Sequence, residues 1–430
     1  MNHPGYFSKM RQILPSVQNF IELLREDLAN RRSLLVILPS SVNADDIWAL
    51  LRACISARGF AFDEVTVADL PLDKPLITGM KAAITMQWKA SVDPLSTAHF
   101  YEHAENLPDV VYFEGFDDLQ PGRRKEILNF LAQWADASHI CADRGGAPMA
   151  LCIVTACAEA VLDPPATDTH LNVHWWWGLP TALELKLVCR MLNSNSDGPV
   201  CQWIEGILPA LAGSDTKLAD HLWDERDVTV EALLQRLSDY AAMQQWDKNK
   251  LRDAGIEAFE EKIAFQNGKS ALMRSKDAKK LWSAGALYWT PEYGVQLNTA
   301  VLALMGKEKE IRHRLWRGQV EYLLPILDRV RLAVCERLTA FYGPAWPYQW
   351  EKPKYEEDYE AVKKDPMACE LGYLHYLLKA CGKMKRDKNL LPLISRAKSV
   401  RNELAHYRPV EYWQYERLMK ETEMLFEGPF

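Results

Sequence analysis

Short, continuous apolar runs alternate with stretches of helical periodicity in residues 1–195. Apolar residues recur at helical spacing between positions 13 and 30, and the apolar run Ser33–Pro39 follows at once. A run without polar alternation is typical of a strand buried on both faces of a parallel sheet. Several such runs, separated by predicted helices, favour a largely parallel α/β sheet. The predicted strands are Ser33–Pro39, Val65–Val67, Val110–Glu114, Ala150–Thr155 and His170–Trp177.

Helical periodicity dominates the rest of the chain. Residues 198–304 carry helical patterns with no internal repeat, which is typical of a lid or connector. The longest pattern, Glu308–Tyr342, opens a series that predicts a C-terminal bundle and continues through Met367–Ala380, Ser395–Leu404 and Val410–Phe426. The sequence thus predicts a multidomain protein of α/β plus α class. Its expected parts are an α/β domain at 1–195, a helical connector at 196–304 and a helical bundle at 305–430.

Composition is that of an ordinary globular protein. Of the residues, 48% are hydrophobic and 25% are charged, and no uncharged apolar run approaches the roughly 18 residues of a membrane span. Charged residues close to the N-terminus exclude a secretory signal peptide. The nine cysteines include no C-x-x-C pair, which indicates reduced core residues and no zinc site. We therefore expect a cytoplasmic protein with no membrane segment and no metal centre.

Charge is distributed unevenly along the chain. The formal net charge of −7 argues against a protein that coats nucleic acid generally. Residues 305–430, in contrast, hold 23 lysines and arginines against 19 aspartates and glutamates. Within them, the stretch Lys379–Arg401 has eight basic residues and one acidic residue, Asp387. A basic run is usually a solvated face, but it also suits contact with nucleic-acid phosphates.

In P-loop proteins, the phosphate-binding loop connects the first strand to the following helix. Such a loop needs G-x-x-x-x-G-K-[ST], because the glycines let backbone N–H groups surround the phosphates. Here the turn Pro39–Asp46 has neither glycine nor lysine, and it carries Asp45 and Asp46 where a helix N-terminus would hold a phosphate. With Val110–Asp118 as an apolar strand that ends in acids, residues 30–195 resemble the STAND and AAA group of P-loop NTPases. We therefore predict a degenerate P-loop-like domain that does not hydrolyse ATP and has no cofactor.

The acidic residues after the strand leave one alternative open. Glu114, Asp117 and Asp118 would hold Mg²⁺ if the domain had kept part of its nucleotide chemistry. The simpler interpretation is that these side chains cap the loop after the strand and the helix that follows.

Candidate chemistry lies near the C-terminal end, in the sequence Arg401-Asn402-Glu403-Leu404-Ala405-His406. Arginine offers a planar, permanently charged fork for a phosphate, and histidine titrates near neutrality. A histidine beside an arginine-bound phosphodiester can move the proton of a ribose 2′-OH without a metal. On one continuous helix the two side chains would lie roughly 140° apart. The helix must therefore end near Ala405, an ending that Arg408-Pro409 favours.

Arg401, Asn402 and His406 resemble the R-x4–6-H motif of HEPN domains, in which a polar residue follows the arginine. The resemblance implies that Arg401 binds the scissile phosphate, Asn402 positions His406, and His406 is the general acid or base. It also implies RNA as the partner, since cleavage would use the 2′-OH, and a site completed in a homodimer of the C-terminal bundle. The residues expected to hold neighbouring RNA phosphates are Arg386, Lys388, Arg396, Lys398 and Arg408.

Two functions are compatible with these features. The first is a metal-independent HEPN-type ribonuclease controlled by an inactive NTPase-like domain, for which the resemblance implies a setting in bacterial antiphage defence or a toxin system. The second is a non-catalytic sensor or adaptor subunit of a defence complex that binds a partner protein or nucleic acid. The pair of Arg401 and His406 favours the enzyme, because an adaptor has no need of it. His375 is expected to be a packed helix residue and not a third catalytic group.

Overall fold

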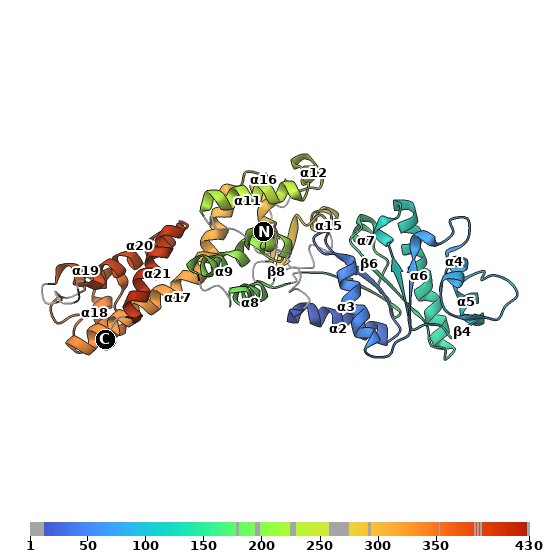
Figure 1. Cartoon of the computed structure of the whole chain (residues 1–430), viewed down its shortest axis with the longest axis horizontal. Helices are drawn as coiled ribbons and strands as arrows, with labels where there is room; N and C mark the ends of the chain where they lie inside the picture. Colours follow the sequence, from blue (N-terminus) through green and yellow to red (C-terminus); the bar gives the residue numbers. More distant parts are fainter. Residues whose placement is uncertain are drawn as a thin grey trace. The chain divides into compact units, whose positions relative to one another are not determined.

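The computed structural model describes residues 13–177, 180–193, 198–223, 229–257, 275–290, 294–351, 353–381, 384, 387 and 389–427. The chain forms two compact units (Figure 1). The first, the sheet unit, comprises the residues up to Glu184 together with Ser214–Lys217 and Trp246–Asn298. The second, the helical unit, comprises Leu185–Gly213, Leu218–Gln245 and the residues from Thr299 onward. Residues of the predicted connector therefore contribute to both units.

A five-stranded parallel sheet forms the core of the sheet unit (Figure 1). The strand order is β2-β5-β6-β1-β7, so β1 pairs with β6 on one side and with β7 on the other. Every residue of β1 and β6 is buried, which explains their unbroken apolar sequences. The predicted α/β plus α class, with a parallel sheet and many helices, is confirmed. The strands are β1 (Ser33–Ile37), β2 (Phe62–Thr66), β5 (Val110–Glu114), β6 (Ala150–Thr155) and β7 (Leu171–Trp175).

The path of the chain reverses direction around β1. From β1 the chain passes through α3 (Ala44–Ser56) to the far edge strand β2, returns through β5 to β6, and then crosses β1 to reach β7. In open parallel sheets, ligands bind beyond the carboxyl ends of the strands where such a reversal occurs. The turn between β1 and α3 lies at that edge. The other elements of the sheet unit are α2 (Pro15–Ala29), η2 (Val67–Asp69), α4 (Leu76–Ala83), β3 (Gln87–Trp88), α5 (Thr97–His103), β4 (Ala104–Glu105), η3 (Phe116–Asp118), α6 (Pro121–Asp143), α7 (Ala158–Leu162), α12 (Lys248–Asp253), α15 (Lys276–Ser283), β8 (Leu287–Thr290) and β9 (Gly294–Leu297).

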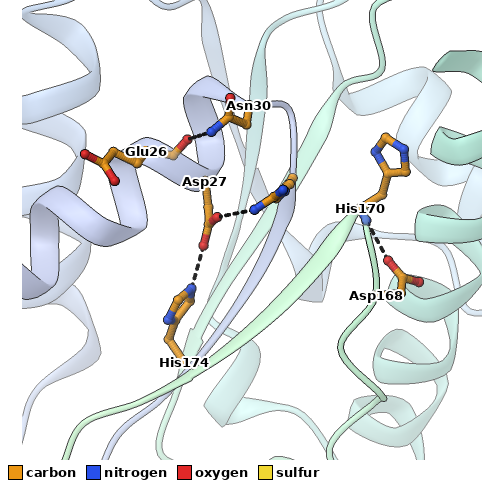
Figure 2. A network of polar contacts seen from close by, with 7 residues as sticks. Glu26, Asp27, Asn30, Asp168, His170 and His174 are labelled. Atoms are coloured by element: carbon orange, nitrogen blue, oxygen red, sulfur yellow. Dashed lines mark hydrogen bonds and ion pairs between the residues drawn. The ribbon is translucent and has the colours of Figure 1, made fainter.

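An aspartate–histidine pair joins α2 to the edge strand β7 (Figure 2). The buried Asp27 places Oδ2 2.6 Å from Nε2 of His174, and its Oδ1 accepts a hydrogen bond from Arg32 at 3.3 Å. The backbone N–H of His170 donates to Asp168 at 2.6 Å, so the two histidines have separate partners (Figure 2). Because a hydrogen bond gains strength away from water, the contact of the buried Asp27 with His174 fixes the edge strand against α2.

Among the residues that the structure describes, helices alone build the part of the helical unit that carries the motif. The long helix α17 (Glu308–Tyr342) continues through Pro325 and packs on α9 (Pro199–Ala212) and on α20 (Leu391–Ala405). In turn, α20 packs on α19 (Leu371–Ala380) and α21 (Tyr412–Glu427) (Figure 1). The bounds predicted for the longest helix are confirmed. The remaining helices are α8 (Ala182–Asn193) and α10 (Thr216–Trp223), which begin in the sheet unit, and α11 (Val230–Met243), α16 (Thr299–Leu304), α18 (Glu356–Lys364) and η4 (Pro366–Ala368).

Two glycines allow α9 and α17 to approach closely. A Cβ added at Gly206 of α9 would lie 2.4 Å from Cγ of Tyr322 on α17. A Cβ added at Gly318 of α17 would lie 3.0 Å from Cβ of Ala210 and 3.2 Å from the carbonyl oxygen of Gly206. The clash at Gly206 falls on the stem of the tyrosine, which cannot swing away as the end of a flexible side chain can.

Gly206→Ala is therefore expected to destabilise the helical unit by about 3 kcal/mol, the cost of forcing an extra methyl into a packed core. The matched control is Gly122→Ala in α6, where an added Cβ has no atom within 4 Å. The control should be neutral or stabilising by up to ~1 kcal/mol, because alanine favours helix. Urea unfolding followed by fluorescence checks both variants. Equal midpoints for the two variants would contradict the close crossing.

Candidate functional site

A cleft of about 460 Å³ opens at the carboxyl edge of the sheet. Its position, beside the turn after β1, is where open parallel sheets bind their ligands. Lys217, an exposed residue of the sheet unit, also lines the cleft and brings a positive charge that the turn itself lacks. No pattern in the sequence points to Lys217, because only the fold brings this residue to the edge of the sheet. The lining residues are Ser40, Val42, Asn43, Ala44, Asp45, Tyr112, Gly115, Phe116, Asp117, Asp118, Val154, Ala156 and Lys217.

The acidic residues beside the cleft hold the protein's own backbone and hydroxyl groups. Asp117 accepts hydrogen bonds from the Thr155 hydroxyl and, at 2.9 Å, from the backbone N–H of Ala156. Glu114 accepts from the Thr66 hydroxyl at 3.3 Å. These bonds tie the loop after β5 to the ends of β6 and β2. In the described part of the chain, no group of three or more histidine, cysteine, aspartate or glutamate residues is placed to hold a metal ion.

The turn between β1 and α3 has already used N–H groups that a phosphate loop would offer. The backbone N–H of Ser40 donates to the carbonyl oxygen of Ser283 at 2.9 Å, and that of Val42 donates to Pro39 at 2.9 Å. The Asn43 side chain caps α3 by accepting from the N–H of Asp45 at 3.0 Å. A phosphate at this position would have to displace these bonds and approach two carboxylates, Asp45 and Asp46, in the first turn of α3.

The motif helix ends where the sequence predicts. α20 finishes at Ala405 with His406 as its C-cap. The N–H of Arg408 then donates to Glu403 at 3.0 Å and the N–H of Tyr407 to Leu404 at 3.2 Å, the two bonds of a Schellman ending. Tyr407 occupies the left-handed position with φ of 58°, where glycine is usual. Its ring packs at a tilt against that of Trp316, with the ring centroids 4.8 Å apart, so α17 holds this strained turn in place.

His406 is exposed at this helix end. Its backbone N–H donates to the carbonyl oxygen of Asn402 at 3.1 Å, so the main chains of these two residues are in contact. Within the described ranges, no side chain hydrogen-bonds the imidazole of His406, so both ring nitrogens are available to a substrate or to a second copy of the chain.

Arg401 lies on the face of α20 that packs against α19. Its Nη2 atom would be 3.7 Å from a Cβ placed at Gly372, the second residue of α19. Its Nε is buried and has no hydrogen-bond partner. Among the residues that the structure describes, no carboxylate pairs with the Arg401 guanidinium, which is therefore a half-buried cation without a counter-ion.

The other predicted phosphate ligands have different surroundings. Arg396 makes two hydrogen bonds to Glu421 of α21, at 2.9 and 2.7 Å, and this contact raises the pKa of the arginine. Arg408 makes two bonds to Glu403, at 2.6 and 3.2 Å. Lys398 is half-buried and has no carboxylate partner among the described residues. The remaining two, Arg386 and Lys388, lie outside the described residues.

A second histidine lies on the same face as Arg401. His375 of α19 is half-buried, and burial followed by the positive charges of Lys398 and Lys379 lowers its pKa. Gly372 and His375 are three residues apart on α19, and Lys398 and Arg401 are three apart on α20, so each pair shares a helix face. Arg401 therefore meets α19 at Gly372, and Lys398 lies near enough to His375 to affect its pKa. The sequence predicted His375 as a packed helix residue, and only the packing of α19 on α20 shows which residues surround it.

No protein-family model matches this chain, and a search of curated proteins finds no similar sequence. The resemblances to HEPN domains and to P-loop NTPases therefore stay predictions. No helix among the described residues is both long and apolar enough to cross a membrane.

Proposed function

We propose that the chain is a metal-independent ribonuclease whose helical unit is a HEPN-like bundle, with Arg401 as the phosphate ligand. The observation that carries the proposal is the contrast among the arginines of one region. Arg396 and Arg408 are each neutralised by a glutamate, whereas the buried Nε of Arg401 has no partner. A half-buried guanidinium without a counter-ion is costly, so its presence favours an anionic substrate.

The exposed position of His406 fits a site completed by a second protomer. Arg401 faces α19, while His406 stands at the end of α20 with its ring free. In a homodimer formed through the bundle, His406 of one copy would meet the phosphate held by Arg401 of the other. A chain that cleaved RNA while strictly monomeric would contradict this arrangement.

The sheet unit supports a regulatory role and not a nucleotide-hydrolysing one. A parallel sheet with the reversal at β1 and a cleft at its carboxyl edge agrees with a P-loop-like fold. However, the turn after β1 has committed its N–H groups to Ser283, Pro39 and the Asn43 side chain. The carboxylate of Asp117 could bind Mg²⁺ by its chemistry. Instead it accepts hydrogen bonds from the Thr155 hydroxyl and the Ala156 N–H.

We therefore expect no ATP turnover above background and no ATP-dependent shift in the thermal unfolding of the purified chain. The reason is the missing phosphate cradle, which Lys217 alone cannot replace. Phosphate release measured with and without Mg²⁺ checks this expectation. A turnover that Asp117→Asn or Asp118→Asn abolishes would overturn it.

The ribonuclease proposal is tested by incubating the purified full chain with total RNA and with tRNA in the presence of EDTA. We expect fragments that end in a cyclic phosphate, because attack by the 2′-OH leaves that product. The competing function is an adaptor subunit, favoured if no RNA is cut and His406→Ala keeps full activity in cells.

A further inference from the structure

We propose that His375 is the proton acceptor of the same site, so that the face shared by α19 and α20 holds the RNA phosphodiester between Arg401 and His375. This role rests on the proposed ribonuclease function. It adds a residue outside the R-x4–6-H motif and gives the site a base from the same chain that supplies the arginine.

The register of the two helices places the required groups together. Arg401 meets α19 at Gly372, its second residue, where a Cβ would lie 3.7 Å from the Nη2 atom of the arginine. One turn further along each helix, the charge of Lys398 on α20 acts on His375 of α19. A phosphate held by Arg401 therefore lies one helical turn from the imidazole, with Lys398 alongside.

The electrostatics of this face call for an anion. Arg401, Lys398 and Lys379 have no carboxylate partner among the described residues, unlike Arg396 and Arg408. In addition, Arg401 points at the first turn of α19, which has no side-chain cap. A cation beside the positive end of a helix is unfavourable, and an anion placed between the two reverses the sign of that interaction.

His375 has the protonation state that a base requires. Burial and the charges of Lys398 and Lys379 disfavour the imidazolium, so the ring is neutral at pH 7. No described residue hydrogen-bonds the ring, which leaves a nitrogen free to accept a proton.

Cleavage in this site uses His375 as the proton acceptor and His406 as the proton donor. The neutral ring of His375 accepts the proton of the ribose 2′-OH, and the 2′-oxygen forms a bond to phosphorus. The bond from phosphorus to the 5′-oxygen breaks, and that oxygen takes a proton from the imidazolium of His406. The products are a 2′,3′-cyclic phosphate and a 5′-hydroxyl. Arg401 balances the charge that develops on the non-bridging oxygens.

The test compares His375→Gln with wild type, with His139→Gln as the control histidine in the sheet unit. Single-turnover cleavage of labelled single-stranded RNA is measured in EDTA, together with binding of the same RNA made uncleavable by 2′-deoxy substitution. His375→Gln should lower the cleavage rate on the order of 10²-fold or more and leave binding unchanged. Imidazole added to His375→Ala should restore cleavage. On the acidic side, the wild-type rate should fall only at a pH below the ordinary pKa of histidine, where the base, whose own pKa is lowered, becomes protonated.

The outcomes separate this role from the proposed function. If Arg401→Lys and His406→Asn lose cleavage while His375→Gln cuts at the wild-type rate, the role of His375 is overturned and the ribonuclease stands. If His375→Gln weakens binding as much as cleavage, its role as a proton acceptor is likewise overturned. If the wild-type chain cuts no RNA at all, the proposed function fails and this role fails with it.

Discussion

His406→Asn is expected to slow RNA cleavage on the order of 10²–10⁴-fold, the usual contribution of a positioned acid or base. Asparagine is well tolerated at helix ends, and His406 is exposed at the C-cap of α20, so the fold of the turn should survive. Initial rates on a labelled RNA in EDTA, at equal protein concentration, measure the loss.

The matched control for this variant is His139→Asn. His139 is also exposed, but it lies in the sheet unit with Nε2 3.6 Å from Asp143. This control should cleave at the wild-type rate. If His406→Asn were equally active, and a change elsewhere on the surface abolished function in cells, the adaptor function would replace the enzyme.

Arg401→Lys is expected to lower cleavage by about 10²–10³-fold although the charge is kept. A lysine is a point charge on a flexible stem and cannot make the two parallel bonds that a guanidinium gives a phosphate. Removing one fixed donor to the developing negative charge typically has an effect of this size. The shorter reach from α20 should also leave the first turn of α19 without its neighbour at Gly372.

Arg312→Lys is the control for the arginine substitution. Arg312 lies in α17 of the same unit and donates to Glu308 at 2.6 Å, so its charge is neutralised within the chain. This variant should retain wild-type cleavage and stability. A loss of activity equal to that of Arg401→Lys would mean that any arginine substitution in the helical unit disturbs the protein, and Arg401 would have no special role.

The sequence predicts most clearly the strands that are buried on both faces and the helices with a long, regular apolar period. β1 and β6 are buried on both faces, so their sequences are unbroken apolar runs and could be recognised locally. The helix Glu308–Tyr342 was predicted from its long helical period. The strand order and the assignment of Ser214–Lys217 to the sheet unit depend on contacts between distant residues, and no local pattern encodes these contacts.

In the candidate site, too, local sequence features could be predicted and contacts between helices could not. The motif residues Arg401 and His406 could be named from type and spacing, and the helix end between them followed from Arg408-Pro409. Whether an arginine is free could not be predicted, because the partner of Arg396 is Glu421, on the next helix. The contact of Arg401 with α19 at Gly372, and the effect of Lys398 on His375, depend on how α19 packs on α20, which the sequence alone does not give.

Metal-independent cleavage through the ribose 2′-OH is tested with two substrates in EDTA. One is a single-stranded RNA, and the other is the same strand with a 2′-deoxy nucleotide at the cleavage position. The wild-type chain is expected to cut the RNA to a 2′,3′-cyclic phosphate and a 5′-hydroxyl and to leave the deoxy-substituted position intact. Cleavage that requires a divalent metal, or that proceeds at the 2′-deoxy position, would contradict it.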